Sequence, residues 1–227
     1  MFRVKICGIT NVDDALAVAA AGADAIGLNF FPGSVRCVDV QTARRIVATI
    51  GERVTVVGVF VNATVEQMKG LADQLPLNFV QLHGAESPAR LQELSPRGVI
   101  RVFRLRPGEE QGVVEFLGEA QRLKAPPAAV LVDAYQKGVF GGTGESADWE
   151  QVARLRNSIL DCPLILAGGL NPSNVRDAIR RTRCAGVDTA SGVEAAPGKK
   201  DVAKIRQFVA SARDAFAELA GSDRQRS

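Results

Sequence analysis

A cysteine near the N-terminus and an aspartate near the middle of the chain are the residues best suited to move protons. Cys7 lies in the stretch Lys-Ile-Cys-Gly-Ile-Thr, and Asp133 ends the apolar run that begins at Ala129. A thiol, with an ordinary pKa of about 8.5, acts as a base where positive charge or a helix N-terminus favours the thiolate. A carboxyl group facing it would deliver a proton to a leaving oxygen. The alternatives are an inert buried thiol and, for Asp133, a loop cap or salt bridge.

Two glycine-containing stretches in the last third of the chain suit a phosphate group. Gly168 and Gly169 come just before a helix-start pattern, and Ser191 and Gly192 follow a later apolar run. Glycine lets the backbone approach an anion closely, and a helix N-terminus presents free N–H groups to it. The pattern predicts a phosphate site formed by both stretches. The alternative is that the glycines only make tight turns.

Three further residues are candidates for contacting a substrate. Arg36 follows a Gly-Ser turn and suits bidentate binding of a carboxylate, the alternative being a solvated surface arginine. His83, the only histidine, follows an apolar run and is either a site residue or an ordinary loop residue. Gly142 lies in the run Gly-Gly-Thr-Gly that follows Asp133. The residues alone leave these alternatives open.

The elements that must position these residues alternate eight times between short apolar, β-branched runs and longer segments of helical period. Near-continuous apolar runs are typical of parallel strands covered on both faces. Eight such units in 227 residues favour a single-domain (β/α)₈ barrel, an α/β fold, over an open doubly wound sheet. A parallel barrel gathers its functional residues at the carboxyl ends of its strands. The expected strands are 3–7, 24–30, 54–61, 79–83, 99–105, 129–133, 163–167 and 186–190.

Helix-start signals lie between the expected strands. Capping residues, capping boxes and proline at the first helical position mark such starts. We also expect a full helix within 106–124, a domain spanning 1–220 and a disordered polar tail over 221–227. The start patterns are Asn11 ahead of two aspartates, Thr64 with Gln67, Ser87-Pro88 and Asn171-Pro172.

Composition predicts a soluble, cytoplasmic protein that binds neither nucleic acid nor membrane. Hydrophobic residues make up 46% and charged residues 23% of the chain, and the net charge of +3 is too small for a nucleic-acid surface. No apolar run approaches the roughly 18 residues that span a bilayer, and the N-terminus lacks a signal-peptide layout. The cysteines show no C-x-x-C spacing, so we expect no metal site and free thiols at Cys7, Cys37, Cys162 and Cys184.

Taken together, the motifs resemble those of the phosphoribosylanthranilate isomerase family of tryptophan biosynthesis. The resemblance runs from Lys5 to Asp201, with the motifs in the family's order. They are Lys-Ile-Cys-Gly-Ile-Thr at 5–10, Gln-Leu-His-Gly at 81–84, Asp133 with Gly-Gly-Thr-Gly at 141–144, Gly-Val-Asp at 186–188, Ser-Gly-Val-Glu at 191–194 and Pro-Gly-Lys-Lys-Asp at 197–201.

The resemblance implies a cofactor-independent (β/α)₈ barrel acting on a small phosphosugar, as a monomer or homodimer. The implied reaction is the Amadori rearrangement of N-(5-phosphoribosyl)anthranilate to 1-(2-carboxyphenylamino)-1-deoxyribulose 5-phosphate. Cys7 matches the family's general base, and Asp133 matches its general acid. Arg36 matches the arginine that holds the anthranilate carboxylate, and Asp188 matches an aspartate that supports the substrate amine or the acid–base geometry. Gly168, Gly169, Ser191 and Gly192 match its phosphate loops.

Two departures from the family pattern concern substrate contacts, and two other functions compete with this one. Cys37 stands where an aromatic residue is frequent, and Ala190 stands where a serine is usual.

A related barrel isomerase of histidine biosynthesis, or an enzyme acting in both pathways, typically pairs two aspartates, whereas Cys7 holds the first position here. A non-catalytic phosphosugar-binding barrel would tolerate loss of Cys7 or Asp133, yet both are present.

Overall fold

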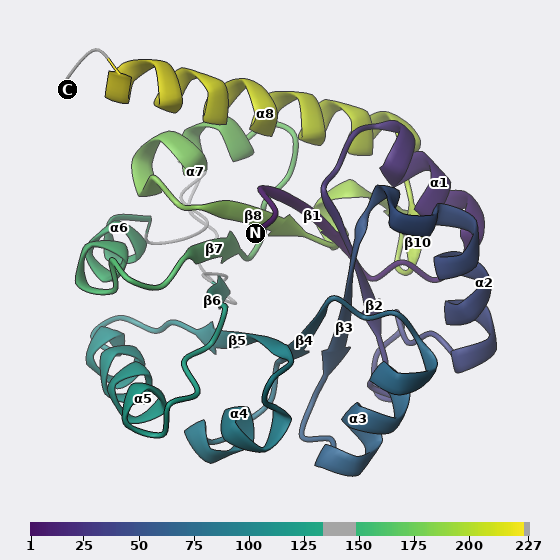
Figure 1. The fold of residues 1–227 in the computed structure, drawn as a ribbon. Helices are drawn as coiled ribbons and strands as arrows, with labels where there is room; N and C mark the ends of the chain where they lie inside the picture. Colours follow the sequence, from purple (N-terminus) through teal and green to yellow (C-terminus); the bar gives the residue numbers. More distant parts are fainter. Residues whose placement is uncertain (134–148, 225–227) are drawn as a thin grey trace.

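The computed structural model describes residues 1–133 and 149–224. Within these ranges, parallel strands β1 to β8 pair in sequence order, and β1 also pairs with β8, so that the sheet closes into a barrel (Figure 1). This closure confirms the predicted fold class and excludes the open sheet. The strands are β1 (Val4–Cys7), β2 (Ala25–Asn29), β3 (Thr55–Phe60), β4 (Phe79–Leu82), β5 (Gly98–Arg104), β6 (Ala129–Asp133), β7 (Leu164–Ala167) and β8 (Gly186–Thr189).

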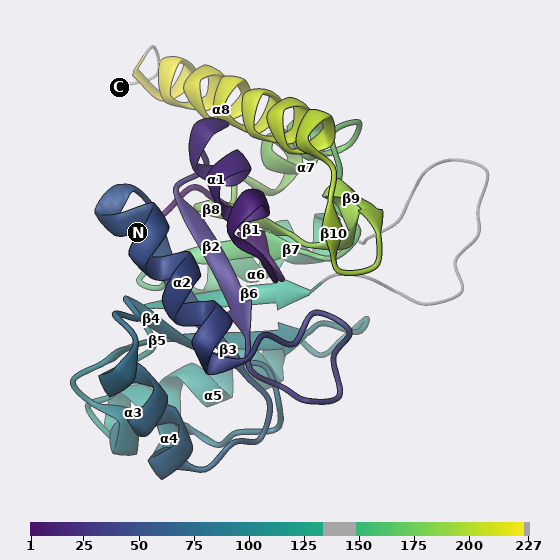
Figure 2. The same ribbon diagram turned by 90° about the vertical axis from the view of Figure 1, so that its right-hand side faces the viewer.

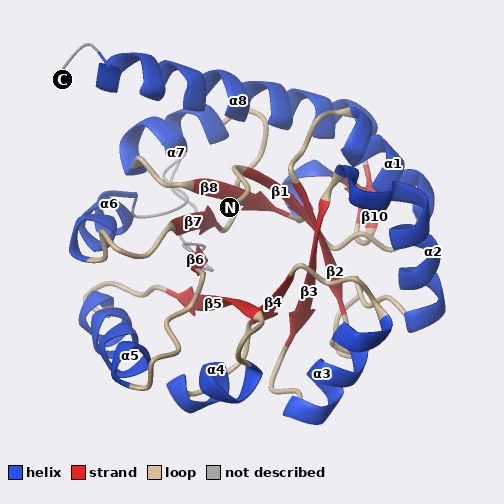
Figure 3. Ribbon diagram, in the orientation of Figure 1, coloured by secondary structure: helices blue, strands red, loops and turns tan. Residues whose placement is uncertain are grey.

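Helices surround the barrel on its outside (Figure 3). The last helix is long and lies across α7 and α1 (Figure 1). No helix among the described residues is both long and apolar enough to cross a membrane. The α-helices are α1 (Val12–Ala20), α2 (Val40–Ile50), α3 (Val65–Gln74), α4 (Pro88–Leu94), α5 (Glu110–Arg122), α6 (Trp149–Ser158), α7 (Val175–Thr182) and α8 (Val202–Arg224). Single 3₁₀ turns are η1 (Gly51–Arg53) and η2 (Ser191–Val193).

A small hairpin that the sequence did not predict follows η2. Its strands are β9 (Glu194–Ala196) and β10 (Lys199–Lys200), which pair antiparallel. Figure 2 shows this hairpin at the end of the barrel toward which the strand arrows point. The hairpin therefore lies at the end where a parallel barrel carries its functional groups.

Alternate residues of each strand face the inside of the barrel because side chains on a β-strand alternate with a period of two. The intervening residues pack outward against the helices. Both faces are therefore apolar along most of each strand, which explains the continuous runs in the sequence. The inward-facing cluster comprises Phe2, Ala25, Val57, Ile100, Val102, Ala129, Leu131, Ile165 and Ala167.

Three of the predicted helix starts are confirmed. The Asn11 side chain accepts a bond from the Asp14 backbone N–H ahead of α1. Thr64 and Gln67 form a complete capping box at the start of α3. Pro88 is the first residue of α4, and α5 lies within the predicted range 106–124.

Two predictions at helix ends are wrong. Helix α7 begins at Val175 rather than at the predicted Pro172, because the Asn171 side chain accepts bonds from the Ser173 backbone and hydroxyl and so makes a local turn instead. The chain is also helical beyond 220, where a disordered tail was expected. Helix α8 continues to Arg224, anchored through Glu218, which binds arginines of α7. Residues 225–227 lie outside the described ranges.

Candidate active site

Lys5 and Asp188 form a buried ion pair between β1 and β8. The two residues are register partners on neighbouring strands, and both face inward. The Lys5 Nζ lies 2.9 Å from Asp188 Oδ1, with the lysine side chain fully buried. Burial lowers the pKa of Lys5, but the charges of Asp188 and Cys7 outweigh this and raise it, so the lysine is charged at neutral pH.

Cys7 lies one inward position beyond Lys5 on the same strand. Its register partner on β2 is Gly27, and the Cys7 Sγ lies only 2.6 Å from the point that a Gly27 Cβ would occupy. The Cε of Lys5 lies 3.2 Å from that same point, so the missing side chain leaves room for thiol and lysine together. Burial raises the pKa of the Cys7 thiol. The positive charges of Lys5 and Lys200 oppose this rise but do not cancel it, so the pKa stays above its ordinary value.

His83 and Asp133 contribute to the mouth of the barrel from β4 and β6. Burial lowers the pKa of His83, although the charges of Asp133 and Asp188 work in the opposite direction. The histidine is therefore neutral at pH 7. The Gln81 Nε2 lies 3.4 Å from His83 Nδ1, and an amide NH₂ donating there leaves the ring proton on Nε2. Asp133 is half-buried at the last position of β6, in the inward register of Ala129 and Leu131.

Arg36 is not a solvated surface arginine. Its Nε and Nη2 each donate to one oxygen of Glu194 at 2.7 Å, a bidentate ion pair between the loop after β2 and the first residue of β9. These bonds raise the pKa of Arg36. Lys200 of β10 also donates to Glu194, at 3.0 Å. Burial raises the pKa of Glu194, but the bonds from Arg36 and Lys200 outweigh burial, so the carboxylate is ionised at neutral pH.

The two glycine stretches predicted to bind phosphate lie side by side after β7 and β8. Gly168 and Gly169 adopt left-handed φ values of +95° and +67°, which glycine reaches without strain. A Cβ on Gly192 would lie 1.8 Å from the carbonyl oxygen of Leu170, so η2 sits tightly against the β7 loop. The Thr189 hydroxyl donates to the same Leu170 oxygen at 2.6 Å.

The structure thus places nearly all the predicted site residues at one end of the barrel. Gly142 and the rest of 141–144 lie outside the described residues. Sequence reasoning did not single out Lys5, Glu194 and Lys200, which the structure places in buried or half-buried ion pairs at the site. The two-residue spacing of Lys5 and Cys7 could have indicated that they share a strand face. Glu194 and Lys200 meet through the unpredicted hairpin, for which the sequence offered no signal beyond the Pro-Gly turn at 197–198.

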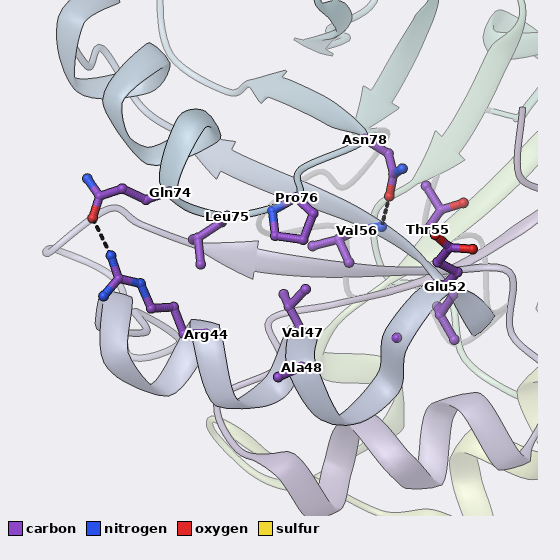
Figure 4. A pocket seen from close by; sticks show the side chains of 12 residues that line it. Arg44, Val47, Ala48, Glu52, Thr55, Val56, Gln74, Leu75, Pro76 and Asn78 are labelled. Atoms are coloured by element: carbon purple, nitrogen blue, oxygen red, sulfur yellow. Dashed lines mark hydrogen bonds between the residues drawn. The ribbon is translucent and has the colours of Figure 1, made fainter.

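The described residues carry no group of three or more His, Cys, Asp or Glu side chains that could hold a metal ion. The four cysteines are free thiols. A groove of about 710 Å³ lies at the opposite end of the barrel, between α2 and the segment after α3 (Figure 4). Two hydrogen bonds lie within it: Arg44 donates to Gln74, and the Val56 backbone donates to the Asn78 side chain. This groove is separate from the mouth.

The family model and similar known proteins point to one family. The family model for N-(5'-phosphoribosyl)anthranilate (PRA) isomerase matches residues 4–211. The N-(5'-phosphoribosyl)anthranilate isomerase of Azotobacter vinelandii is 47% identical over 215 residues, covering 94% of this chain and 98% of that protein. The crystal structure of phosphoribosyl anthranilate isomerase from Thermotoga maritima is 38% identical, with a TM-score of 0.82 over 94% of this chain and 100% of that one.

A second solved structure of this kind contains a ligand. It is a phosphoribosyl anthranilate isomerase in complex with reduced 1-(o-carboxyphenylamino)-1-deoxyribulose 5-phosphate. It is 36% identical to this chain, with a TM-score of 0.81, and the match covers 94% of this chain and 100% of that one. That ligand carries a carboxylate at one end and a phosphate at the other.

Proposed function

The chain belongs to the N-(5'-phosphoribosyl)anthranilate isomerase family, and on that premise we propose which of its residues carry the reaction. The protein is an isomerase of tryptophan biosynthesis that converts N-(5'-phosphoribosyl)anthranilate into 1-(2-carboxyphenylamino)-1-deoxyribulose 5-phosphate. The observation that carries the assignment of residues is the inward cluster of Cys7, Lys5 and Asp188, with a cationic site on one side and the glycine stretches on another.

The first step is opening of the ribose ring, with Asp133 as the acid. Asp133 gives a proton to the ring oxygen while the bond between that oxygen and C1′ breaks. The lone pair of the anthranilate nitrogen forms a C1′=N bond, giving a protonated Schiff base. The half-buried position of Asp133 at the end of β6 supports this role. A proton transfer by a placed group of this kind typically contributes about 10²–10⁴-fold to the rate.

The second step is proton removal from C2′, with the Cys7 thiolate as the base. The electrons of the C2′–H bond form a C1′=C2′ bond, and the iminium nitrogen becomes neutral. The resulting enolamine then gains a proton at C1′ from water and gives the proton of its C2′ hydroxyl to water, which leaves the ketose. The Cys7 thiol returns its proton to solvent and the Asp133 carboxylate takes one from solvent, which resets both groups. The ammonium group of Lys5, fully buried beside Cys7, supports this assignment because it stabilises the thiolate.

Asp188 acts through Lys5 in this scheme. The ion pair between them supports the expected role in acid–base geometry rather than the alternative role of binding the substrate amine. A buried ammonium without a partner tends to lose its proton, so Asp188 keeps Lys5 charged. In this scheme His83, whose pKa the charge of Asp133 raises against the effect of burial, is neutral and donates a bond from Nε2 to a substrate oxygen.

The two ends of the substrate bind on different sides of the mouth. Arg36 takes the anthranilate carboxylate, and Gly168, Gly169, Ser191 and Gly192 take the phosphate. Binding of the carboxylate and of the phosphate orients the sugar between Cys7 and Asp133, which lowers the entropic cost of both proton transfers. The ligand is a small phosphosugar. Four expectations stay predictions. They are Gly142 as a substrate contact, a single barrel domain that begins at residue 1, a cytoplasmic location, and a monomeric or homodimeric state.

Turnover of purified protein tests this proposal. Substrate conversion is followed in the wild type, Cys7→Ala and Asp133→Asn, and complementation of a tryptophan auxotroph is scored for the same set. We expect conversion and growth for the wild type only, because each variant lacks one proton-transfer group. Asp133→Asn also keeps the shape of the side chain. Near-normal kcat in either variant contradicts the corresponding role. An assay with the aminoimidazole phosphosugar of histidine biosynthesis measures the competing activity.

A further inference from the structure

The arginine assigned to the substrate carboxylate already holds a carboxylate of the protein. Both oxygens of Glu194 lie 2.7 Å from Arg36, on its Nε and Nη2. A guanidinium has five N–H donors, so Nη1 and the second hydrogen of Nη2 remain for an end-on contact with another carboxylate. The geometry thus permits a second partner. The charge does not favour one, because Arg36 and Glu194 together are neutral.

Lys200 supplies the missing positive charge. Its side chain is fully buried, and its Nζ donates to Glu194 Oε1 at 3.0 Å. Burial lowers the pKa of Lys200, and the bond to the Glu194 carboxylate opposes this effect. With Arg36, Glu194 and Lys200 all ionised, the cluster carries one net positive charge next to the mouth. Lys204 adds a cation behind it by donating to the Glu194 main-chain carbonyl at 2.8 Å, but that lysine is exposed to solvent.

The same ammonium group also reaches the phosphate side of the mouth. The Lys200 Nζ donates to the carbonyl oxygen of Ala190 at 2.9 Å. A trans peptide is planar, and its C=O and N–H point in opposite directions. Fixing the Ala190 carbonyl toward Lys200 therefore turns the N–H of Ser191 away from Lys200, at the first residue of η2.

We propose that Lys200 is a positioning residue that serves both ends of the substrate at once. It restores the positive charge that lets Arg36 bind a second carboxylate, and it orients the Ser191 N–H for the phosphate. This inference rests on the proposed function for the identity of the two ends. It goes beyond it by making the β9–β10 hairpin a shared support for two grips on different loops.

The test measures each end separately, without turnover. Binding of anthranilate reports the carboxylate grip, and binding of inorganic phosphate reports the phosphate grip, each by titration calorimetry or by competitive inhibition. Lys200→Met is compared with Lys199→Met, a matched control on the exposed neighbouring position of the same strand. We expect Lys200→Met to weaken both ligands by about tenfold or more, as for loss of a charge-assisted contact. Lys199→Met should weaken neither by more than about twofold.

Kinetics and a conservative variant distinguish positioning from general support of the fold. Lys200→Met should raise KM. Because the charge of Lys200 also lowers the pKa of Cys7, kcat is compared above the low-pH limb of each pH–rate profile, where Cys7 is ionised and kcat should change little. Lys200→Arg keeps the charge and should recover part of both affinities. Unchanged binding of both fragments in Lys200→Met overturns the proposal, and so does loss of kcat alone.

A second background keeps the proposal testable if Lys200→Met does not fold. In Glu194→Gln the carboxylate that neutralises Arg36 is gone, so adding Lys200→Met leaves no buried unpaired charge. In that background, adding Lys200→Met should change the affinity for anthranilate only slightly. It should weaken phosphate binding as strongly as it does in the wild type. Equal costs for both fragments contradict the charge argument. If the wild type binds both fragments through Lys200 but converts no substrate, the proposed function is contradicted, whereas this inference about Lys200 is not.

Discussion

Lys5 and Asp188 stand 183 positions apart in the chain, yet they form one buried ion pair at the seam where the barrel closes, 2.9 Å apart and next to Cys7. The Lys5 side chain of this pair is inaccessible to solvent. A buried ion pair adds little net stability, because desolvation offsets most of the attraction. We interpret it as a device that holds a positive charge next to the thiol.

Replacing Lys5 with Met should shift the pH dependence of catalysis. Without the cation, burial and the charge of Asp188 both raise the pKa of Cys7 further. The low-pH limb of kcat/KM, where the rate grows as the thiolate forms, should move up by about 1 pH unit or more. The loss of activity should therefore be largest at pH values below the low-pH limb and should shrink once the pH exceeds the raised pKa of Cys7, as a pH–rate profile extended above pH 9 would show.

The control for this experiment is Lys5→Met combined with Asp188→Asn. The single variant leaves Asp188 buried without a partner, which costs on the order of 3–5 kcal/mol of unfolding free energy. The double variant removes both charges and should recover most of that stability in a denaturant titration. A single variant whose pH–rate profile coincides with that of the wild type would show that Lys5 is only structural.

Cys7 variants should separate loss of the base from its replacement. Cys7→Ser puts a far weaker base in the same place, and we expect kcat to fall by about 10² or more with near-normal folding. Cys7→Asp supplies a base of lower pKa, so part of the rate should return and the low-pH limb should move to lower pH. Steady-state kinetics measured at several pH values report both effects. A Cys7→Ser enzyme with wild-type kcat would identify the thiol as a packing residue.

Arg36→Met should act on substrate binding rather than on the chemical step. We expect kcat/KM to fall by a factor that corresponds to a loss of roughly 1.5–3 kcal/mol in binding free energy, the range of a charge-assisted hydrogen-bonded contact. A substrate analogue without the anthranilate carboxylate should react equally well with the wild type and the variant. If the variant still distinguishes the two substrates as strongly as the wild type does, Arg36 does not recognise the carboxylate.

Gly192→Ala should weaken phosphate binding by moving η2. The added Cβ would lie 1.8 Å from the Leu170 carbonyl, so the two loops must separate. We expect KM to rise by about tenfold or more, with inhibition by inorganic phosphate weakened in parallel. Gly221→Ala, in helix α8, is the matched control, since no heavy atom lies within 4 Å of its added Cβ. Equal KM values in both variants would remove η2 from the phosphate site.

Short-range patterns explain why the strands could be predicted so closely. Each expected strand coincides with an observed one to within two residues at either end, from β1 to β8. The signals that marked them, such as apolar runs and a capping box at Thr64, depend on neighbours within a few residues. At Asn171 the same kind of signal misled, because a side-chain turn competed with helix initiation and won.

The sequence by itself determined the barrel, the residues at its strand ends and, through the resemblance of its motifs, the family. Only the tertiary structure decided which of these residues touch. Arg36 meets Glu194 across 158 positions, and Lys200 reaches Ala190 through a hairpin. The physical reason is that side-chain period and capping are set locally, whereas a contact between distant residues depends on strand register and on closure of the sheet. Burial then gives those contacts their effect on charge, because an ammonium beside a thiol matters most where water is excluded.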